Sequence, residues 1–532
     1  MRIALFSYSK IFGETLEMDI LVSCLNYAGH QAFHFGLTTG APDRKMIDNL
    51  SIELIGILYS FRNKDWNTSI LDYLHESFPH SKICMMIDFP DGYDQELLMV
   101  SPHIDYVLRG EREQSFCELV GLIERHDSLI HCPGLTYRDS ENRIIRNSCG
   151  PAIEDLNVLP LASKEDLTRK RIKHTLFYTS RGCPYQCSFC MDSIRKGEYR
   201  VRSIESVVAE IDSCCKQHII HGIHFTDDTF HDAKPPYNRV KSLANELINH
   251  NIKVLYTANF RAEFSQYVDN KTINLLLQSG LYAVLLGIES GNETDLQLYN
   301  KKTTVAQNQQ AIDFWRQKKI HTSIGFINFN PYSTMDTLYE NLEFLSKNDL
   351  GNLALLCKRL WLIYDTEIYK QVASDGLITD WHFDNIFNYH FYDTRIELLY
   401  QYISDYYHAL SKSGYNDGNE YFEMMAYLNQ LAHTHSLSQV NELALDYTER
   451  FRAVFKEINT ASTYLFSELL MLLKTGWSEE KAVSVTKNCF SAHKIANLFV
   501  SAAKLKEQLL YKLYKLPDKT RDTVMFYLDK YI

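Results

Sequence analysis

The sequence has neither a long hydrophobic run nor an excess of positive charge. No apolar stretch reaches the roughly 18 residues of a membrane helix, and the best candidate, Leu465–Leu473, is interrupted by Glu468. The formal net charge is −11, whereas nucleic-acid-binding proteins usually present a basic face. The sequence therefore argues against membrane insertion and against a nucleic-acid partner.

We also expect no targeting segment, and the sequence shows no second cysteine cluster. The first residues, Met1-Arg-Ile-Ala-Leu-Phe6, enter a strand pattern directly, so we expect no signal peptide. Twelve cysteines without such a signal are typical of a reducing compartment, and we expect a cytoplasmic protein. No second C-x2-C pair and no H-x3-H pair follows Cys190 to complete a zinc site.

The length of 532 residues, with 45% hydrophobic and 23% charged residues, predicts two or three ordinary globular domains. We place them at residues 1–150 and 173–394, joined by a linker over 151–172, and at 395–532.

The first region alternates between strand and helix patterns. Such alternation predicts an α/β fold with an open, mostly parallel sheet, whose ligands bind at the carboxyl ends of the strands. The expected strands are Arg2–Ser9, Leu54–Tyr59, Lys82–Ile87 and Ile104–Leu108, and the expected helices are Leu16–Ala28 and Trp66–Phe78. A hairpin is expected to begin at Pro133–Asp139.

The central region repeats a strand–helix pattern about six times. Right-handed crossovers between parallel strands would curl it into a partial (β/α)6 barrel with its chemistry at the strand carboxyl ends. The expected strands are His174–Ser180, Gly222–Asp227, Lys253–Asn259, Tyr282–Glu289, Thr322–Phe329 and Leu353–Ile363. The expected helices are Ile204–Lys216, Tyr237–Asn249, Lys271–Gly280, Val305–Lys319 and Thr334–Asn348.

The last region shows apolar residues near a period of 3.6 and predicts an all-helical domain. The expected helices are Glu397–Leu410, Glu420–Thr434, Gln439–Asn459, Ser462–Thr475, Glu479–Ala492 and Ala502–Leu516.

The most informative stretch is Thr179-Ser-Arg-Gly-Cys-Pro-Tyr-Gln-Cys-Ser-Phe-Cys190, in which Cys183, Cys187 and Cys190 follow a C-x3-C-x2-C spacing. Thiolates are the usual ligands of iron–sulfur clusters, and a [4Fe–4S] cluster normally takes four. Three cysteines on one loop would leave one iron open to a substrate or a second cofactor. Disulfides and a zinc site are the other interpretations, and the missing signal peptide and second pair argue against them.

This stretch resembles the signature of radical S-adenosylmethionine (SAM) enzymes. The resemblance implies that the open iron chelates the amino and carboxylate groups of SAM. It also implies that one electron from the cluster cleaves SAM to a 5′-deoxyadenosyl radical, which abstracts a hydrogen atom from the substrate. An external one-electron donor such as flavodoxin or ferredoxin is then a necessary partner.

Polar residues follow the expected barrel strands in the order that the family shows. The resemblance implies SAM contacts from the following residues: Asp227 or Asp228, Asn259, Arg261, Glu289, Ser290, Gly325 and Ile327. Gly325 is expected to permit close approach of the adenine, on which the Ile327 region packs. Adjacent carboxylates such as Asp227-Asp228 also serve as helix caps, so that alternative stays open. For Lys301-Lys302 a solvated charge pair is the local interpretation.

The run Asp105-Tyr-Val-Leu-Arg-Gly-Glu-Arg-Glu113 looks like the end of the cobalamin-binding, Rossmann-like domain fused to some radical SAM enzymes. The resemblance spans residues 1–370 and implies cobalamin-dependent methyl transfer. Two features depart from it. No Asp-x-His-x-x-Gly loop occurs, and the usual Gly-Gly turn is replaced by Ile87-Asp-Phe-Pro-Asp-Gly92, whose bulk could block the corrin's nucleotide tail. Ser60, at the end of an earlier expected strand, matches the pattern of that family. A sheet that serves only as a lid or substrate wall is the alternative.

Cys357 falls within the sixth expected strand. A thiol there can return a hydrogen atom to a carbon radical, as in radical SAM peptide epimerases, and buried packing is the alternative. The predicted function is thus C-methylation of a peptide or small-molecule natural-product precursor, with epimerisation through Cys357 as the second candidate. A non-catalytic electron-transfer or sensor protein is the rival from another class.

Overall fold

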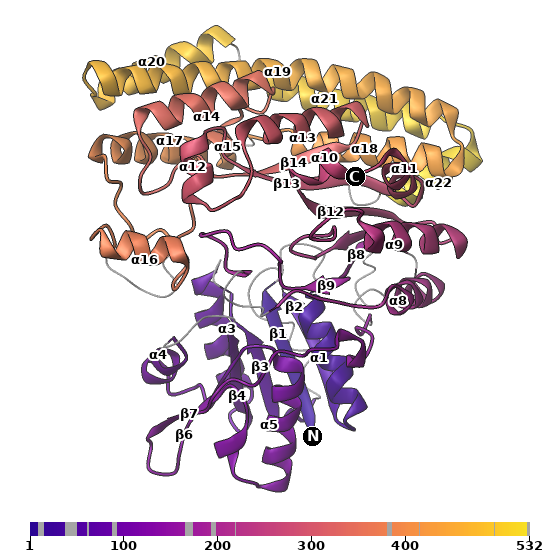
Figure 1. Ribbon diagram of the computed structural model, residues 1–532, viewed down its shortest axis with the longest axis vertical. Coiled ribbons are helices and arrows are strands. Elements are labelled where there is room, and N and C mark those ends of the chain that lie inside the picture. Colours follow the sequence, from indigo (N-terminus) through magenta and orange to yellow (C-terminus); the bar gives the residue numbers. More distant parts are fainter. Residues whose placement is uncertain are drawn as a thin grey trace. The chain divides into compact units, whose positions relative to one another are not determined.

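The structure is a computed structural model (Figure 1). It describes residues 1–8, 15–37, 50–60, 63–87, 93–164, 174–192, 198–218, 220–379, 386–413, 415–493 and 495–528. The chain divides into two compact units. Unit 1 comprises Met1–Pro184 and Met191–Asp228, and unit 2 comprises Tyr185–Cys190 and Thr229–Ile532. The cysteine loop contributes to both units, and the domain boundaries near residues 150, 172 and 394 stay a prediction.

Unit 1 contains the predicted open sheet. Its described strands run in the order β2-β1-β3-β4-β5-β6-β7, parallel from β2 to β5 and antiparallel from β5 to β7. Their apolar sequences, such as Ile-Ala-Leu-Phe in β1, are typical of parallel strands buried on both faces. The strands are β1 (Arg2–Tyr8), β2 (Gln31–Leu37), β3 (Leu54–Leu58), β4 (Lys82–Ile87), β5 (Tyr106–Arg109), β6 (Leu135–Arg138) and β7 (Ile144–Arg146).

Helices α1 and α5 share one hydrophobic cluster with the strands, which includes Met18, Leu21, Phe116 and Leu119. The described helices of this part are α1 (Leu16–Tyr27), α3 (Lys64–Ser77), α4 (Tyr93–Val100) and α5 (Arg112–Arg125). The strand order reverses between β1 and β3, so the carboxyl ends of these two strands form a switch point, the usual ligand position in open parallel sheets. Residues 88–92, which hold the replaced Gly-Gly turn, lie outside the described residues.

The remainder of unit 1 carries the approach to the cysteine loop. Strand β8 (His174–Phe177) pairs in parallel with β11 (Gly222–Phe225). The short strands β9 (Ser180–Arg181) and β10 (Arg200–Val201) pair antiparallel, so they bring the two ends of the loop region together. Helix α8 (Ile204–Gln217) follows, with Ser203 as its N-cap.

Unit 2 continues the strand–helix repeat. The parallel strands β12 (Leu255–Arg261), β13 (Leu281–Glu289) and β14 (His321–Phe326) lie side by side in that order. Four helices of this repeat agree with the predicted ones to within a few residues: α9 (Asn238–Asn249), α11 (Asn270–Gln278), α13 (Val305–Gln317) and α14 (Met335–Lys347). Two short helices, α10 (Phe264–Tyr267) and α12 (Glu293–Leu298), were not predicted.

The sixth predicted strand, Leu353–Ile363, is wrong. Its first part is the helical turn α15 (Leu353–Leu356), capped by the Asn352 side chain, and its second part forms only an isolated bridge between Arg359 and Phe329. The Leu-Ala-Leu-Leu run has no β-branched residue, and leucine and alanine are strong helix formers. An apolar run this short cannot be assigned to strand or helix from periodicity alone.

The C-terminal helices pack around a core that includes Met424, Leu428, Tyr447 and Phe451. They follow α16 (Glu367–Ser374) and comprise α17 (Thr394–Lys412), α18 (Asn419–His435), α19 (Ser438–Thr475), α20 (Glu479–His493), α21 (Ile495–Tyr514) and α22 (Asp518–Tyr527), with α19 running as one long rod in Figure 1. No helix among the described residues combines the length and apolar character of a membrane span.

Helix α19 corrects the predicted break near residue 460. Thr460, Ser462 and Thr463 each donate a side-chain hydrogen bond to the carbonyl four residues earlier, at 2.8, 2.9 and 3.0 Å. Hydroxyls that bond in this way are satisfied inside the helix, so this polar stretch does not end it.

Candidate active site

Asp227 holds the segment that leads into the cysteine loop. Its side chain is 1% exposed and accepts hydrogen bonds from the Thr179 amide at 3.0 Å, the Thr179 hydroxyl at 2.6 Å and the Ser180 hydroxyl at 2.5 Å. A carboxylate with so many donors satisfies a buried loop rather than an external ligand. Of the two predicted aspartates, the partly exposed Asp228 is therefore the better candidate for SAM.

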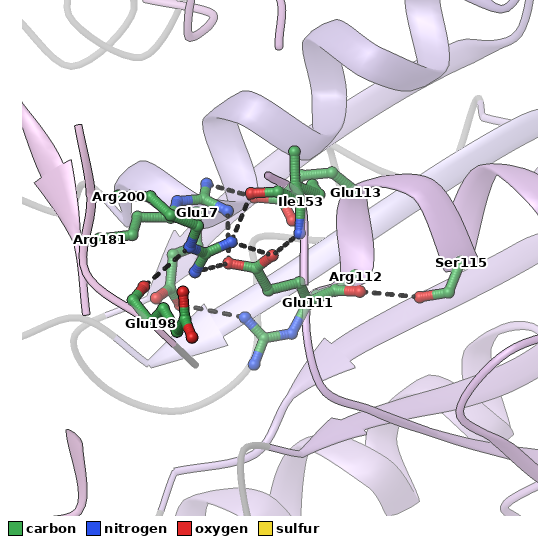
Figure 2. A network of polar contacts seen from close by, with 9 residues as sticks. All are labelled: Glu17, Glu111, Arg112, Glu113, Ser115, Ile153, Arg181, Glu198 and Arg200. Carbon is green, nitrogen blue, oxygen red and sulfur yellow. Dashed lines mark hydrogen bonds and ion pairs between the residues drawn. The ribbon is translucent and has the colours of Figure 1, made fainter. Parts of the chain in front are cut away.

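A network of charges joins the same segment to the first sheet of unit 1 (Figure 2). The Arg181 guanidinium, two residues before Cys183, donates to Glu113 at 2.5 Å and to Glu111 at 3.4 Å. Glu111 also makes a two-pronged pair with Arg200, with both N–O distances at 2.9 Å. Arg181 and Arg200 lie on β9 and β10, so two carboxylates at the start of α5 hold both strands of this hairpin.

The network is closed by backbone groups. The Ile153 amide donates to Glu111 at 2.6 Å, and Arg200 donates to the Ile153 carbonyl at 2.5 Å. Although partial burial opposes ionisation, the bond from Arg200 and the Ile153 amide lower the pKa of Glu111 below its ordinary value. Glu111 is therefore ionised at neutral pH and provides the negative charge that both arginines need.

In unit 2, residues 186, 188 and 189 of the cysteine loop are held by uncharged contacts. The Ser188 amide donates to the Tyr299 carbonyl at 2.9 Å, and its hydroxyl donates to the Leu298 carbonyl at 2.6 Å. The Asn300 side-chain amide donates to the Gln186 carbonyl at 2.7 Å, and the Phe189 ring packs edge-on to Tyr299. The backbone carbonyls of residues 298 and 299 and the Asn300 side chain therefore support this half of the loop.

Arg261, at the end of β12, lies against one of the loop cysteines. Its guanidinium donates to the Cys187 sulfur at 3.5 Å and stacks on the Tyr185 ring at 3.8 Å from the centroid. It also donates to Glu263 and to the Lys301 carbonyl. Burial would lower the pKa of Arg261, but the Glu263 carboxylate raises it above its ordinary value, so the group stays charged. The predicted SAM contact thus lies beside a predicted cluster ligand.

A buried ion pair occupies the carboxyl ends of β13 and β14. Lys301, 4% exposed, donates to Glu289 at 2.9 Å. Glu289 has a positive φ of 66° and follows a register shift between β13 and β14, and its side chain is 13% exposed. Since Lys301 is buried and paired, the solvated interpretation of this lysine is wrong.

Two glycines make room for this pair. A Cβ at Gly287 would lie 2.8 Å from the Lys301 amine, and one at Gly325 would lie 3.2 Å from the Glu289 carboxylate. Gly325 was expected to admit the adenine of SAM, and the structure places it against a carboxylate. Nearby, the buried Ile327 donates its amide to the Glu289 carbonyl at 2.7 Å.

Ser290 lies inside a cage of polar side chains. Its hydroxyl, fully buried, lies 2.8 Å from Asn341 and 3.1 Å from Asp295, and it accepts from the Asn292 side chain at 3.0 Å. Burial raises the pKa of Asp295 above its ordinary value, although the amide donors oppose this rise. The hydroxyl of Ser290 is thus engaged within the fold, and a contact to SAM stays a prediction.

Asn259 lies near the end of β12 as predicted, whereas Cys357 has different surroundings from those expected. Asn259 is half-buried on β12, and its carbonyl accepts from the Phe230 amide at 2.9 Å. Cys357 caps α15, is buried, and donates from its sulfur to the Ile403 carbonyl at 3.4 Å. Burial raises the pKa of this thiol above its ordinary value. Cys357 therefore packs between α15 and α17 and does not lie on a barrel strand.

The cysteines fit a cluster by their chemistry. None of the twelve, all of which lie among the described residues, forms a disulfide. Cys183 belongs to unit 1, whereas Cys187 and Cys190 belong to unit 2. Within the described part of the chain, no group of three or more His, Cys, Asp or Glu side chains is arranged to hold a metal ion. The match to a cluster therefore rests on three thiols in one short loop, one of them beside a guanidinium.

Sequence reasoning missed several partners of these residues. Glu263 was not singled out, although its position two residues after Arg261 on a strand end was a usable signal. Glu111 and Glu113 were noted only as part of a resemblance, and nothing local connected them to Arg181. Pairs of this kind depend on which segments meet in space.

Comparisons with known proteins agree with this picture. Residues 177–345, which include the cysteine loop, match the family model of the radical SAM superfamily. The anaerobic magnesium-protoporphyrin IX monomethyl ester cyclase of Rubrivivax gelatinosus is 30% identical over 275 residues, which cover 49% of this chain and 48% of that one. The uncharacterized methyltransferase PH0819 of Pyrococcus horikoshii is 29% identical over 256 residues, covering 47% and 54%. The chain thus spans about half the length of these curated relatives.

Among solved structures, the cobalamin-dependent SAM radical enzyme OxsB, with aqua-cobalamin and SAM bound, is similar over 99% of this chain and 84% of its own. The TM-score is 0.71 at 18% sequence identity, so the likeness concerns the fold. The α/β class predicted from sequence, with an N-terminal parallel sheet, a central strand–helix repeat and a helical end, is confirmed. The chain therefore carries a radical SAM domain within a fold that it shares with a cobalamin-dependent radical SAM enzyme.

Proposed function

We propose that this chain is a radical SAM enzyme that uses cobalamin to methylate a carbon atom of a small-molecule natural-product precursor. The observation that carries the proposal is the family match over residues 177–345, which contains the C-x3-C-x2-C loop, in a chain that also has an open parallel sheet. The name of PH0819, a methyltransferase, supports methyl transfer, and the name of OxsB, a cobalamin-dependent enzyme, supports the use of cobalamin.

The cluster ligands are Cys183, Cys187 and Cys190 in this proposal. A [4Fe–4S] cluster held by these thiolates would offer one open iron to SAM and would supply the electron for its cleavage to methionine and a 5′-deoxyadenosyl radical. The chain's own residues position the loop: Arg181 anchors the approach to Cys183, and Ser188 fixes the segment between Cys187 and Cys190. The electron comes from an external low-potential one-electron donor.

Among the residues predicted to contact SAM, we expect some to bind it directly and others to support those contacts. Asp228 is partly exposed at the end of β11, and Asn259 is half-buried on β12. Glu289, held by Lys301, offers a fixed carboxylate, and Ile327 offers an apolar surface beside it. Asp227 and Ser290 are engaged inside the fold, so we expect them to support these contacts rather than make them.

Cobalamin is placed at the carboxyl ends of β1 and β3, where the strand order reverses. There the Ser60 amide donates to Asn67 at 2.9 Å, and the Asn67 amide returns a bond to the Ser60 carbonyl at 2.8 Å. The Tyr59 and Tyr93 rings are buried, and their hydroxyls lie 2.5 Å apart. A backbone segment fixed in this way at a switch point fits a ligand that binds outside the strand ends.

We do not propose epimerisation, because the buried Cys357 thiol is hydrogen-bonded between two helices. A non-catalytic cluster protein would need a fourth fixed ligand, and no further cysteine follows Cys190 until Cys214. Methyl transfer is therefore the outcome that we test.

The experiment starts with anaerobic reconstitution of the full chain, followed by iron, sulfide and 5′-deoxyadenosine measurements with SAM and dithionite. We expect about four irons per chain and SAM cleavage. Serine at Cys183, Cys187 or Cys190 should abolish cleavage, whereas Cys149→Ser, at an exposed cysteine, should leave it unchanged. Protein without iron, or serine variants with full cleavage, would contradict the proposal.

A second measurement tests cobalamin. The protein is incubated with hydroxocobalamin and desalted, and the retained corrin absorbance is recorded. We expect about one corrin per chain, and reduced retention for Asn67→Ala, which frees the Ser60 backbone. SAM cleavage without corrin retention would leave the radical SAM assignment intact and reject cobalamin-dependent methylation.

A further inference from the structure

Arg261 and Glu263 form a charge pair directly beside a loop cysteine, all within unit 2. The Arg261 guanidinium reaches the Cys187 sulfur at 3.5 Å, and its Nε donates to Glu263. The side chain of Arg261 is 6% exposed and that of Glu263 is 17% exposed. Charges this far from water are weakly screened, so their effect on a neighbouring group is large.

The arginine is held so that it cannot turn away from the sulfur. Its guanidinium lies on the Tyr185 ring at 3.8 Å, and it also donates to the Lys301 carbonyl. Lys301 is itself fixed by its pair with Glu289 at 2.9 Å. A planar guanidinium can stack on a ring and donate to several acceptors at once, which a lysine amine cannot do.

We propose that Arg261 and Glu263 set the reduction potential of the cluster through the Cys187 sulfur. The proposal rests on the function proposed above. Reduction adds one electron, from an external one-electron donor, to a cluster whose ligand Cys187 carries negative charge, and no proton is transferred. A guanidinium that donates to this sulfur favours the reduced state, because hydrogen bonds to sulfur and positive charge raise the potential of such clusters. The Glu263 carboxylate acts in the opposite direction.

Removing each of the two opposite charges should shift the reduction potential of the cluster in opposite directions. Arg261→Gln removes the positive charge and leaves Glu263 without its partner, so the potential falls. Glu263→Gln removes the negative charge and leaves the arginine in place, so the potential rises. A residue that only maintained the shape of the loop would not produce shifts of opposite sign. Arg261→Lys keeps the charge but loses the planar contact, and its potential is expected between wild type and Arg261→Gln.

The test is a mediated redox titration of the reconstituted full chain, followed by electron paramagnetic resonance of the reduced cluster. At a fixed potential, we expect the ratio of reduced to oxidised cluster to change at least tenfold, downward for Arg261→Gln and upward for Glu263→Gln. For a one-electron couple a tenfold change is about 59 mV. Arg452→Gln breaks an exposed pair with Glu449 on α19 and should leave the potential unchanged.

The outcomes separate the two proposals. Wild-type protein that takes up no iron or sulfide overturns the proposed function and this inference with it. Wild type with a full cluster, but with Arg261→Gln and Glu263→Gln at the wild-type potential, overturns the inference alone. If Arg261→Gln fails to fold, Glu263→Gln still decides, because a missing upward shift in that variant rejects the pair's role.

Discussion

The two halves of the cysteine loop are held by different kinds of contact. On the unit 1 side, the stem strands carry Arg181 and Arg200, which are bound by the carboxylates of Glu111 and Glu113. On the unit 2 side, Ser188 is bound to the backbone carbonyls of residues 298 and 299 by neutral hydrogen bonds. The stem therefore depends on charge and Ser188 on neutral hydrogen bonds, while one charged contact, from Arg261 to Cys187, also lies in unit 2.

The two kinds of contact differ in how far apart their partners lie in the sequence and in what their loss costs. Glu111 is 70 positions from Arg181 and 89 from Arg200 in the sequence, so the charges tie the loop stem to a distant part of the fold. Removing one partner of a charged contact leaves the other charge buried and unpaired. This costs more free energy of folding than the loss of a neutral hydrogen bond. The stem should therefore be the more sensitive half.

The largest effect is expected for Glu111→Ala. It leaves both arginines and the Ile153 amide without their shared carboxylate, and we expect a loss of about 3 kcal/mol in the free energy of unfolding. Urea unfolding measures this loss, and amide hydrogen exchange over residues 174–183 should increase with it. Glu124→Ala, at a half-exposed site on the same helix, should change stability by less than about 1 kcal/mol. Equal effects of the two substitutions would mean that the charge network does not hold the stem.

Ser290→Ala should have the next largest effect, and in the other unit. It removes a buried hydroxyl that Asn292, Asn341 and Asp295 share, at an expected cost of about 1–3 kcal/mol. Hydrogen exchange should increase around residues 288–298 and not at the stem. Ser501→Ala, an exposed serine that bonds only to its own helix, is the matched control. A response in unit 1 would contradict separate support of the two halves.

The pH dependence of stability should distinguish the charged half. The pKa of Glu111 is lower in the folded protein than its ordinary value near 4.5, so its contribution is present above that value and is lost as the pH falls through the folded pKa. In urea unfolding from pH 7 to about pH 3, the wild type should lose more stability than Glu111→Gln, with the loss beginning below the ordinary value near 4.5. Parallel curves for the two proteins would exclude Glu111 as the source of this dependence.

The smallest effect is expected for Ser188→Ala. This variant loses one neutral bond to the Leu298 carbonyl but keeps the backbone bond to Tyr299, so we expect a cost of about 1 kcal/mol. Thermal unfolding measures it, with Ser411→Ala, an exposed serine on α17, as the reference. A loss as large as that of Glu111→Ala would invalidate the ranking of the two halves.

Much of the fold could be predicted because local sequence patterns indicate its helices and strands. Apolar runs such as that of β1, and the 3.6 period of α13 and α14, indicate the correct elements within a few residues. The failures occurred where local signals were ambiguous. The Leu353–Leu356 run suits a strand or a helical turn, and the hydroxyls at 460–463 end a helix unless they bond back to it.

The sequence predicts the site as a set of positions rather than a set of contacts. Strand ends identified Arg261 and Glu289, because polar residues after apolar strands stand out in a sequence. Their partners, Cys187 and Lys301, could not be assigned, since they come from other segments. The same limit applies to Asp227, whose carboxylate is engaged with Thr179 and Ser180.

By itself, the sequence determined the three-cysteine loop, the alternating strands and helices of the first two regions, and the helical end. These features follow from residue spacing, apolar periodicity and capping, which act over a few neighbours. Only the tertiary structure decided that Glu111 and Glu113 hold Arg181, that Arg261 touches Cys187, and that Cys357 packs against α17. Such pairings depend on which strand ends and helix faces become neighbours once the core is packed, and that is a property of the whole fold.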